Sequence, residues 1–398
     1  MRKKTSRIFK VRVRKVSQAF MEFFRQGIFS SILLLVSAAG AMFLANSSYA
    51  GFYENILHVK LAAGFGDYIL SMSLLHWIND GLMAVFFFVV GMEIKREFLF
   101  GELKSLAATI LPIAAALGGM AVPALLYLLF NFSEPTISGW AIPMSTDIAF
   151  AMGLLALVAG NAPRAIAVFL TALAIVDDMG AILVVAIFYS GAMQWLWLFA
   201  GLLVFALLII VSRYRQLPAP FYIAGGLLAW YGFLQAGIHP TVAGVLLGLV
   251  IPARGEDGLL EKLEHMLAPW SAYLIMPVFA LANAGISIDL AGLQELFSPL
   301  AMGIIFGLCL GKPLGILLAV YLLRQFKFVK IPKMLKWGHF AGAGALAGIG
   351  FTMSLFIATL AFPDPQVLNT AKLSIVVASL LSGLVGILLF AAIKSKPR

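Results

Sequence analysis

The sequence predicts an all-α polytopic membrane protein with twelve transmembrane helices. Of its 398 residues, 62% are hydrophobic and only 12% are charged, whereas about a quarter of an average soluble domain is charged. The apolar residues form runs of about 20, the length of a bilayer-spanning helix, rather than the short alternating segments of an outer-membrane barrel. This composition excludes a soluble enzyme and a disordered or fibrous protein. Cys309 is the single cysteine, so an intramolecular disulfide and a Cys-based metal site are also excluded.

Twelve apolar segments define the predicted spans. They cover residues 28–45, 74–92, 105–130, 136–160, 165–189, 194–212, 220–236, 239–251, 266–284, 300–323, 338–360 and 370–392. The loops between them are short, so residues 28–392 are predicted to form a single transmembrane domain. Residues 1–27 form a basic N-terminal segment and residues 393–398 a short C-terminal one. The longest predicted outer loop, 46–72, is consistent with either a small hairpin or an unstructured loop.

The distribution of basic residues predicts the orientation. An even number of spans puts both termini on one side of the membrane. If that side is the cytoplasm, all but three of the 28 Lys and Arg residues lie in cytoplasmic segments. The exceptions are Lys60 and Lys372 outside and Lys312 within a span. This bias supports the number of spans and places both termini in the cytoplasm. The net charge of +10 therefore indicates basic cytoplasmic loops rather than a nucleic-acid partner.

Two adjacent carboxylates lie near the middle of the fifth span. Asp177 and Asp178 occur in AIAVFLTALAIVDDMGAILVVAIFY, where each charge costs about 2.5–3.5 kcal/mol on insertion scales. Successive helical residues are about 100° apart, so one carboxylate can line a cavity while the other meets a neighbouring helix. A carboxylate holds either a proton or a hard cation such as Na⁺. That competition is the physical basis of cation/proton exchange. The alternative is a structural pair anchored to polar partners.

Lys312, in GLCLGKPLGILL, is the one basic residue well inside a predicted span. One interpretation is a side chain that extends to the nearer membrane interface. The other is an ion pair with Asp177 or Asp178, because apolar residues flank the lysine on both sides.

Two spans are predicted to be interrupted at mid-membrane. In GWAIPMSTDIAFAMG, Pro143 removes a helix hydrogen bond, and Ser145, Thr146 and Asp147 compete for the freed backbone groups. The second candidate is AGAGALAGIGFTMSLF, with four glycines followed by Thr352 and Ser354, although glycines also allow close helix packing. These are the fourth and eleventh spans, each the middle of a group of three (3–5 and 10–12). Such a pair indicates inverted repeats with two interrupted helices at mid-membrane.

A second group of charges is predicted near the cytoplasmic face. Glu93, Arg96 and Glu97 end the second span, and Glu264 and His265 lie in GLLEKLEHML. These residues form either an ordinary solvated cluster or one that responds to pH. Asp80 is predicted to cap the outer start of the second span. His239, in an outer turn, is either a plain loop residue or a group that titrates near neutrality.

The sequence closely resembles the NhaA-type sodium/proton antiporters. The matching stretches are WINDGLMAVFFFVVGMEIKREF, PMSTDIAFAMG, FLTALAIVDDMGAILVVAIFY, GIHPTVAGVLLGLVIP, MPVFALANAGIS, GKPLGI and GIGFTMSLFI, between about residues 74 and 357. The resemblance implies electrogenic, pH-regulated exchange of Na⁺ or Li⁺ for H⁺ across the bacterial inner membrane by alternating access. It implies no cofactor, and a homodimer formed partly through a hairpin in 46–72.

The resemblance also implies roles for individual residues. Asp178 would be the main cation and proton ligand, with Asp177 beside it and paired with Lys312 in the proton-loaded state. Thr146 and Asp147 would lie at the crossing of the broken helices, and Gly350 and Thr352 in the partner break. The pH response would involve Glu93, Arg96, Glu97, Glu264 and His265, with His239 as a further candidate. Glu261 and Ala268 depart from the family pattern in this region.

Other functions fit the residues less well. A sodium-coupled symporter for an organic anion would need a roomy cationic site, and Lys312 is the one mid-span cation. An intramembrane aspartyl protease would use Asp147 and Asp177, but these follow Thr146 and Val176 and so lack the YD and GxGD patterns of such enzymes. A passive channel is disfavoured because a buried Asp pair with a lysine favours tight, proton-coupled occupancy. A secondary transporter, not an enzyme, is therefore predicted.

Overall fold

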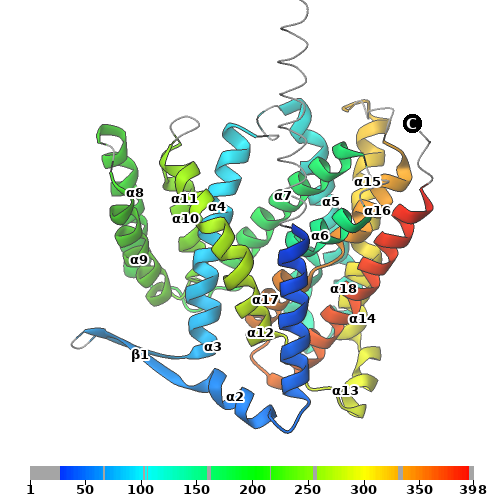
Figure 1. The fold of residues 1–398 in the computed structure, drawn as a ribbon, viewed down its shortest axis with the longest axis horizontal. Coiled ribbons are helices and arrows are strands. Elements are labelled where there is room, and N and C mark those ends of the chain that lie inside the picture. Colours follow the sequence, from blue (N-terminus) through cyan, green and yellow to red (C-terminus); the bar gives the residue numbers. More distant parts are fainter. Residues whose placement is uncertain are drawn as a thin grey trace, which may run out of the picture.

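Apolar segments separated by short polar turns fold into a bundle of helices that carries one β-hairpin (Figure 1). The computed structural model describes residues 27–65, 68–101, 104, 106–158, 163–215, 217–253, 258–329 and 335–393. Nearly all of the predicted cytoplasmic N-terminal segment (1–27) and C-terminal segment (393–398) lies outside these residues. The described part is almost entirely helical, as the composition predicts.

The helices follow the predicted segments in chain order. They are the first described helix (Gly27–Ala45), α2 (Ala50–His58), α3 (Leu74–His76), η1 (Trp77–Leu82), α4 (Met83–Leu99), α5 (Leu106–Asn131), η3 (Pro135–Met144), α6 (Ile148–Val158), α7 (Arg164–Phe188), α8 (Trp195–Tyr214), α9 (Ala219–Ala236), α10 (Thr241–Val250), α11 (Leu259–Trp270), η5 (Ser271–Ile275), α12 (Met276–Asn283), α13 (Leu290–Gln294), η6 (Glu295–Phe297), α14 (Pro299–Phe306), η7 (Gly307–Gly311), α15 (Lys312–Gln325), α16 (Trp337–Ala347), α17 (Phe351–Ala361) and α18 (Pro365–Ala392).

Each of the twelve predicted spans coincides with a helix, a run of continuous helices or a bent pair of helices. Length and composition alone identify fewer crossings: among the described residues eight helices qualify, or ten when each bent pair counts as one span. The difference lies in α9 and α10. With 10 residues, α10 is about 15 Å long, half the thickness of the hydrocarbon core. These criteria therefore show a multi-pass membrane protein without establishing all twelve crossings.

Two pairs of short helices are bent at a break. The axes of η3 and α6 differ by 44° and those of α16 and α17 by 45°. Pro143 precedes the first break, where Ser145 adopts an extended conformation, and Gly348 and Gly350 flank the second. The two breaks meet, because the Asp147 backbone N–H donates to the Ile349 carbonyl at 2.6 Å. The predicted interruptions are thus present, and the partner segment is a true break rather than a packing stripe.

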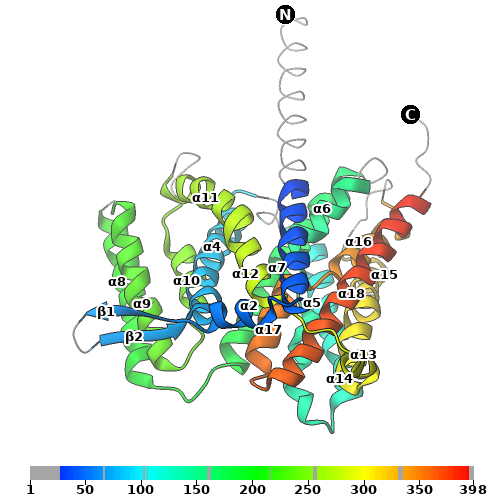
Figure 2. The same cartoon turned by 60° about the horizontal axis from the view of Figure 1, so that its bottom comes forward.

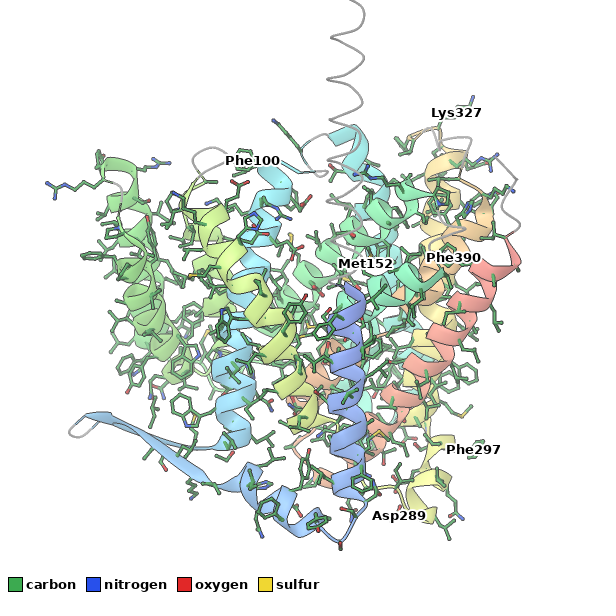
Figure 3. The ribbon with its side chains drawn as sticks, in the orientation of Figure 1. Phe100, Met152, Asp289, Phe297, Lys327 and Phe390 are labelled. Carbon is green, nitrogen blue, oxygen red and sulfur yellow. The ribbon has the colours of Figure 1, made fainter. Side chains whose placement is uncertain are left out.

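The molecule has two opposite faces. Phe100 and Lys327 mark one face and Asp289 and Phe297 the other in Figure 3. The first described helix begins and α18 ends at the same face, here called the terminal face, and the hairpin lies toward the other, here called the hairpin face (Figure 2). The hairpin pairs β1 (Lys60–Phe65) with β2 (Tyr68–Ser73) in an antiparallel register. Of the two alternatives for loop 46–72, the hairpin is therefore correct.

The helices pack around two apolar cores. The larger core involves α5–α7 and α14–α18, the smaller one α8–α11, and α4 contributes to both. On opposite sides of the bundle, α8 and α9 flank one edge and α15, α16 and α18 the other (Figure 1). Glycine allows α4 and α10 to approach closely, since a Cβ on Gly244 would collide with the Ala84 carbonyl oxygen. α4 thus lies between the two cores. Residues of both cores can therefore reach the space beside α7.

Candidate functional site

Asp177 and Asp178 lie midway along α7, and both are almost completely buried. Asp177 Oδ2 is 2.6 Å from Lys312 Nζ, and the lysine side chain has no solvent exposure. The lysine also donates a hydrogen bond to the Met144 carbonyl at the end of η3. Its positive charge therefore offsets both the Asp177 carboxylate and the partial negative charge at that helix end. Of the two sequence-based interpretations of Lys312, the structure contains the ion pair.

The backbone before Lys312 is wound more loosely than an α-helix. Gly307–Gly311 forms a π-helical turn that runs directly into α15. Such turns inside α-helices often occur at functional sites. Here the glycines also admit close neighbours, because a Cβ on Gly311 would meet Pro123 of α5 at 2.8 Å. The loose turn and tight packing bring Lys312 into the middle of the bundle.

Asp178 faces away from the lysine, toward a cavity. The cavity has a volume of about 170 Å³ and is lined by Asp178, Glu93 and Ser271 together with apolar side chains. Oδ1 of Asp178 is buried and has no hydrogen-bond partner among the described residues. A buried polar atom without a hydrogen-bond partner is costly. A bound cation or a proton would satisfy it.

A row of cavities leads from Asp178 to the terminal face. A second cavity, of about 420 Å³, shares Glu93, Ala149 and Ala272 with the first. A third, of about 940 Å³, shares His265 with the second. Consecutive cavities share wall residues and so lie in series between the terminal face and the carboxylate.

The crossing of the broken helices holds Thr146, Asp147 and Thr352. Oδ2 of Asp147 accepts hydrogen bonds from Thr352 Oγ1 at 2.5 Å and Thr352 N at 3.1 Å, and Oδ1 accepts one from Phe150 N at 3.0 Å. Thr146 Oγ1 donates to the Ala347 carbonyl at 2.8 Å. Asp147 thus offsets the positive N-terminal ends of α6 and α17. Its oxygens are already occupied, in contrast to Oδ1 of Asp178.

Gly350 gives α17 its starting geometry at this crossing. It is the N-cap residue of α17, and its carbonyl accepts a hydrogen bond from Ser354 N at 2.8 Å. A Cβ at this position would collide with the Ser354 hydroxyl. Gly350 therefore shapes the break, and Thr352 supplies the side-chain contact to Asp147.

Most of the predicted pH-response residues gather near the terminal face. Arg96 Nη1 lies 2.5 Å from Glu264 Oε1, and its Nη2 lies 3.0 Å from Glu97 Oε1. Glu93 lines the two inner cavities and His265 the two outer ones. Arg96 thereby joins α4 to α11, and the group forms one wall of the route to Asp178.

His239 does not belong to this group. It lies toward the hairpin face, where its Nε2 is 3.8 Å from Asp80 Oδ1. Burial, and secondarily the charge of His76, lower the pKa of His239 to about 4. This shift disfavours titration of His239 near neutrality. Asp80 is not the helix cap either, because Ser73 accepts the hydrogen bond from His76 N.

Other wall residues escaped the sequence analysis. Ser271, Ala272 and Tyr273 border the cavities, and they lie in an ordinary apolar segment. The only local signal is Pro269, which precedes the π-helical turn η5. No group of three or more His, Cys, Asp or Glu that could hold a metal ion occurs in the described part of the chain.

Comparison with known proteins decides the family. The family model described as "Na+/H+ antiporter 1" matches residues 21–390. The chain belongs to this family. Among the relatives of this antiporter-family chain, the "Na(+)/H(+) antiporter NhaA 2" of Clostridium beijerinckii is 52% identical over 389 residues, 96% of each chain. The "Na(+)/H(+) antiporter NhaA" of Shewanella oneidensis is 44% identical over 376 residues, 93% of this chain and 97% of the relative.

A solved structure resembles this family member in fold. The sodium proton antiporter MjNhaP1 from Methanocaldococcus jannaschii superimposes with a TM-score of 0.51, covering 94% of this chain and 99% of that one. The sequences are only 13% identical, so the likeness concerns the fold alone. The NhaA-type resemblance found in the sequence is confirmed by the family match and the curated relatives.

Proposed function

We propose that this protein exchanges Na⁺, or Li⁺, for H⁺ across the bacterial inner membrane. One observation carries the proposal: the unpaired Oδ1 of Asp178 lies at the inner end of a row of cavities. The names of the curated relatives support the choice of ions. No cofactor is required, because the carboxylate itself holds either ion.

The exchange follows from competition at the two carboxylates. A Na⁺ ion that enters along the cavities binds Asp178 and displaces its proton. Asp177 and the Thr146 oxygen complete the site once Lys312 releases Asp177. In this scheme one proton leaves Asp178 and a second leaves the Lys312 ammonium when it is released from Asp177. More protons than cations then move in each cycle, and the exchange is electrogenic.

Alternating access requires the crossing to move. We propose that the broken helices, with α5 and α7, shift against α4 and α8–α11, which pack around the smaller core. The nearly equal bends of 44° and 45°, in the fourth and eleventh of twelve proposed spans, support inverted repeats of spans 3–5 and 10–12. Ion binding favours this movement because the bound ion neutralises the carboxylate charge, which otherwise makes the movement costly.

The surroundings of the site suggest its orientation, assembly and regulation. We place the terminal face, and both termini, in the cytoplasm, as the basic residues predict. Arg96, Glu97 and Glu264, joined at the route to Asp178, would then report cytoplasmic pH together with Glu93 and His265.

The edge of β1 exposes apolar side chains such as Leu61, which is 45% exposed, and an exposed strand edge favours pairing with a second copy. The proposed assembly is a homodimer formed through residues 46–72.

The deciding experiment measures the collapse of a respiration-driven pH gradient in everted vesicles. The host strain lacks its own antiporters, Na⁺ and Li⁺ are added between pH 6 and 9, and K⁺ is the control. We expect a Na⁺ response in the wild type and none in Asp178→Asn. Asp364→Asn changes an exposed carboxylate that caps α18 and should leave the response intact. A well-expressed wild type without any response would refute the exchange, and a response that survives Asp178→Asn would refute the site.

A further inference from the structure

The space around Asp178 closes abruptly on the side toward the hairpin face. Ala181 and Ile182 lie one helical turn beyond Asp178 on α7. They border a void of only about 10 Å³ between α4, α7, α10 and α17. A space of this size holds at most one water molecule, whereas the cavity on the other side of the carboxylate measures about 170 Å³. An ion at Asp178 would thus have a dry layer of closely packed side chains on the hairpin side and a cavity on the other side.

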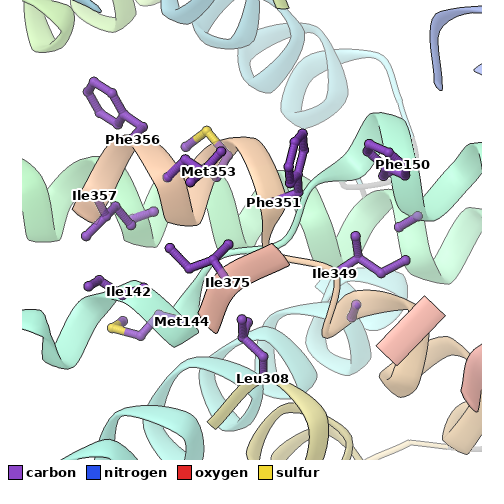
Figure 4. Packing of buried hydrophobic residues seen from close by; sticks show 14 of the residues in the cluster. Ile142, Met144, Phe150, Leu308, Ile349, Phe351, Met353, Phe356, Ile357 and Ile375 are labelled. Carbon is purple, nitrogen blue, oxygen red and sulfur yellow. The ribbon is translucent and has the colours of Figure 1, made fainter. Parts of the chain in front are cut away.

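The aromatic ring of Phe356 is the centre of this layer. Phe356 belongs to α17, is 1% exposed and borders the void. Its ring centroid lies 5.5 Å from that of Phe87, 6.4 Å from that of Phe279 and 5.5 Å from the His239 ring. Side chains from α4, α12 and the turn before α10 therefore converge on one ring. Figure 4 shows Phe356 on α17, the helix that begins at Phe351.

Polar groups resume immediately beyond that ring. The side chains of His239 and Asp80 are 14% and 12% exposed, and nearby Asn283 donates a hydrogen bond to Asn79 at 2.8 Å. The Phe356 ring thus borders both the void beside Asp178 and this polar group. A hydrated cation cannot cross such a layer without losing its ligands, which makes the layer an effective barrier.

The position of Phe356 on α17 links the barrier to the crossing of the broken helices. Phe356 follows Thr352 by four residues and so lies on the same side of the helix. Thr352 binds Asp147 through both its hydroxyl and its backbone N–H. Because α17 contains only 11 residues, a tilt or rotation at the crossing also displaces the Phe356 ring.

We propose that Phe356 is the gate on the hairpin side of the ion path, and that ions leave Asp178 between α4, α7, α10 and α17 when this ring swings aside. The proposal rests on the proposed exchange and specifies the route on its second half. In this proposal the Phe356 ring touches no ion. Its position controls whether the space beside Asp178 is open to the hairpin face.

Chemical labelling tests the gate without requiring transport. Cys309→Ser removes the single native cysteine, and Ala181→Cys places a reporter thiol at the void. A membrane-impermeant cationic thiol reagent is applied from the hairpin side of sealed, oriented vesicles. We expect slow labelling with Phe356 and labelling at least about tenfold faster in Phe356→Ala, equivalent to about 1.4 kcal/mol in favour of the open path. Phe340→Ala is the matched control, because Phe340 is equally buried, at 1% exposure, but lies on α16.

Each outcome bears on the gate. Equal labelling in folded Phe356→Ala and wild-type backgrounds overturns the proposal, as does an equal acceleration by Phe340→Ala. If Phe356→Ala does not accumulate in the membrane, Phe356→Leu replaces it and should label at an intermediate rate. No acceleration in Phe356→Leu would then overturn the gate. Repeating the labelling in an Asp178→Asn background separates the gate from the proposed exchange. Acceleration by Phe356→Ala in that background supports the gate even if no exchange is found in the wild type.

Discussion

Asp177 and Asp178 are neighbours in the chain, but only Asp177 is paired with a cation. Oδ2 of Asp177 lies 2.6 Å from the Lys312 ammonium, whereas Asp178 borders a cavity. The separation of about 100° between successive helical residues makes this division unavoidable. One carboxylate is therefore held by the protein and the other is available to an ion.

The buried ion pair predicts a strong, non-additive effect on stability. Lys312→Met leaves the Asp177 carboxylate buried without its partner, which typically costs 3–5 kcal/mol. We expect a clearly lower Tm in detergent for Lys312→Met. The double variant Lys312→Met/Asp177→Asn should recover most of the loss, because no unpaired charge remains. Two additive losses in the double variant would contradict this account.

The burial of His239 predicts how stability depends on pH. Its pKa is lowered from 6.5 to about 4, so between these values the unfolded chain takes up a proton that the folded protein does not. Stability is therefore lost as the pH falls from 6.5 toward 4. His239→Gln should flatten this part of a Tm-versus-pH curve, and His58→Gln, at an exposed site, should not. The pH midpoint of exchange above pH 6 should be the same in His239→Gln and wild type, and a shifted midpoint would restore His239 as a pH-response residue.

Tyr53 anchors α2 to the body of the protein. Its hydroxyl donates to the Leu281 carbonyl at 2.7 Å, and burial raises the pKa of Tyr53 to about 12. Tyr53→Phe should destabilise the protein by about 1 kcal/mol, the usual net value of one hydrogen bond. It should also speed amide exchange in α2. Tyr49→Phe is the control, because Tyr49 is 61% exposed, and an equal effect of both changes would argue against the anchor.

The contact between α4 and α10 depends on Gly244. A methyl group there would collide with the Ala84 carbonyl oxygen, so Gly244→Ala must force the two helices apart. We expect a loss of about 1–3 kcal/mol, typical of overpacking, measured by thermal unfolding. Gly51→Ala, on α2 with nothing within 4 Å of the added Cβ, should be neutral or slightly stabilising. A stable Gly244→Ala would show that α4 and α10 can move apart freely.

The sequence predicts much of this site because charges in lipid are expensive. Asp147, Asp177, Asp178 and Lys312 stand out in apolar segments, and Pro143 and the glycines before Thr352 indicate the breaks. The residue pattern by itself leaves open which aspartate meets Lys312, since the answer depends on how α7 is rotated, and only the family resemblance points to Asp177. That choice follows only from the packing of α15 against its neighbours.

Other features of the site depend on contacts between distant segments. The ring of half-buried His239 lies 5.5 Å from that of Phe356, which is more than a hundred residues later in the chain, so its low pKa has no local signal. The cavity wall formed by Ser271 and Tyr273 likewise reflects the π-helical turn η5. The short helix α10 shows another limit of the sequence. An apolar segment predicts that residues are buried, but not how many of them are helical.

The unequal spaces on the two sides of Asp178 determine where a membrane voltage acts. The three cavities on the terminal side have volumes of about 170, 420 and 940 Å³. Little of the voltage falls across spaces that fill with water and ions. The insulating part is the thin layer around the 10 Å³ void. Moving one elementary charge through the whole voltage is worth about 2.3 kcal/mol per 100 mV. In the proposed exchange, most of that work would be done between Asp178 and the hairpin face, and the hairpin-side step would be the voltage-sensitive half of the cycle.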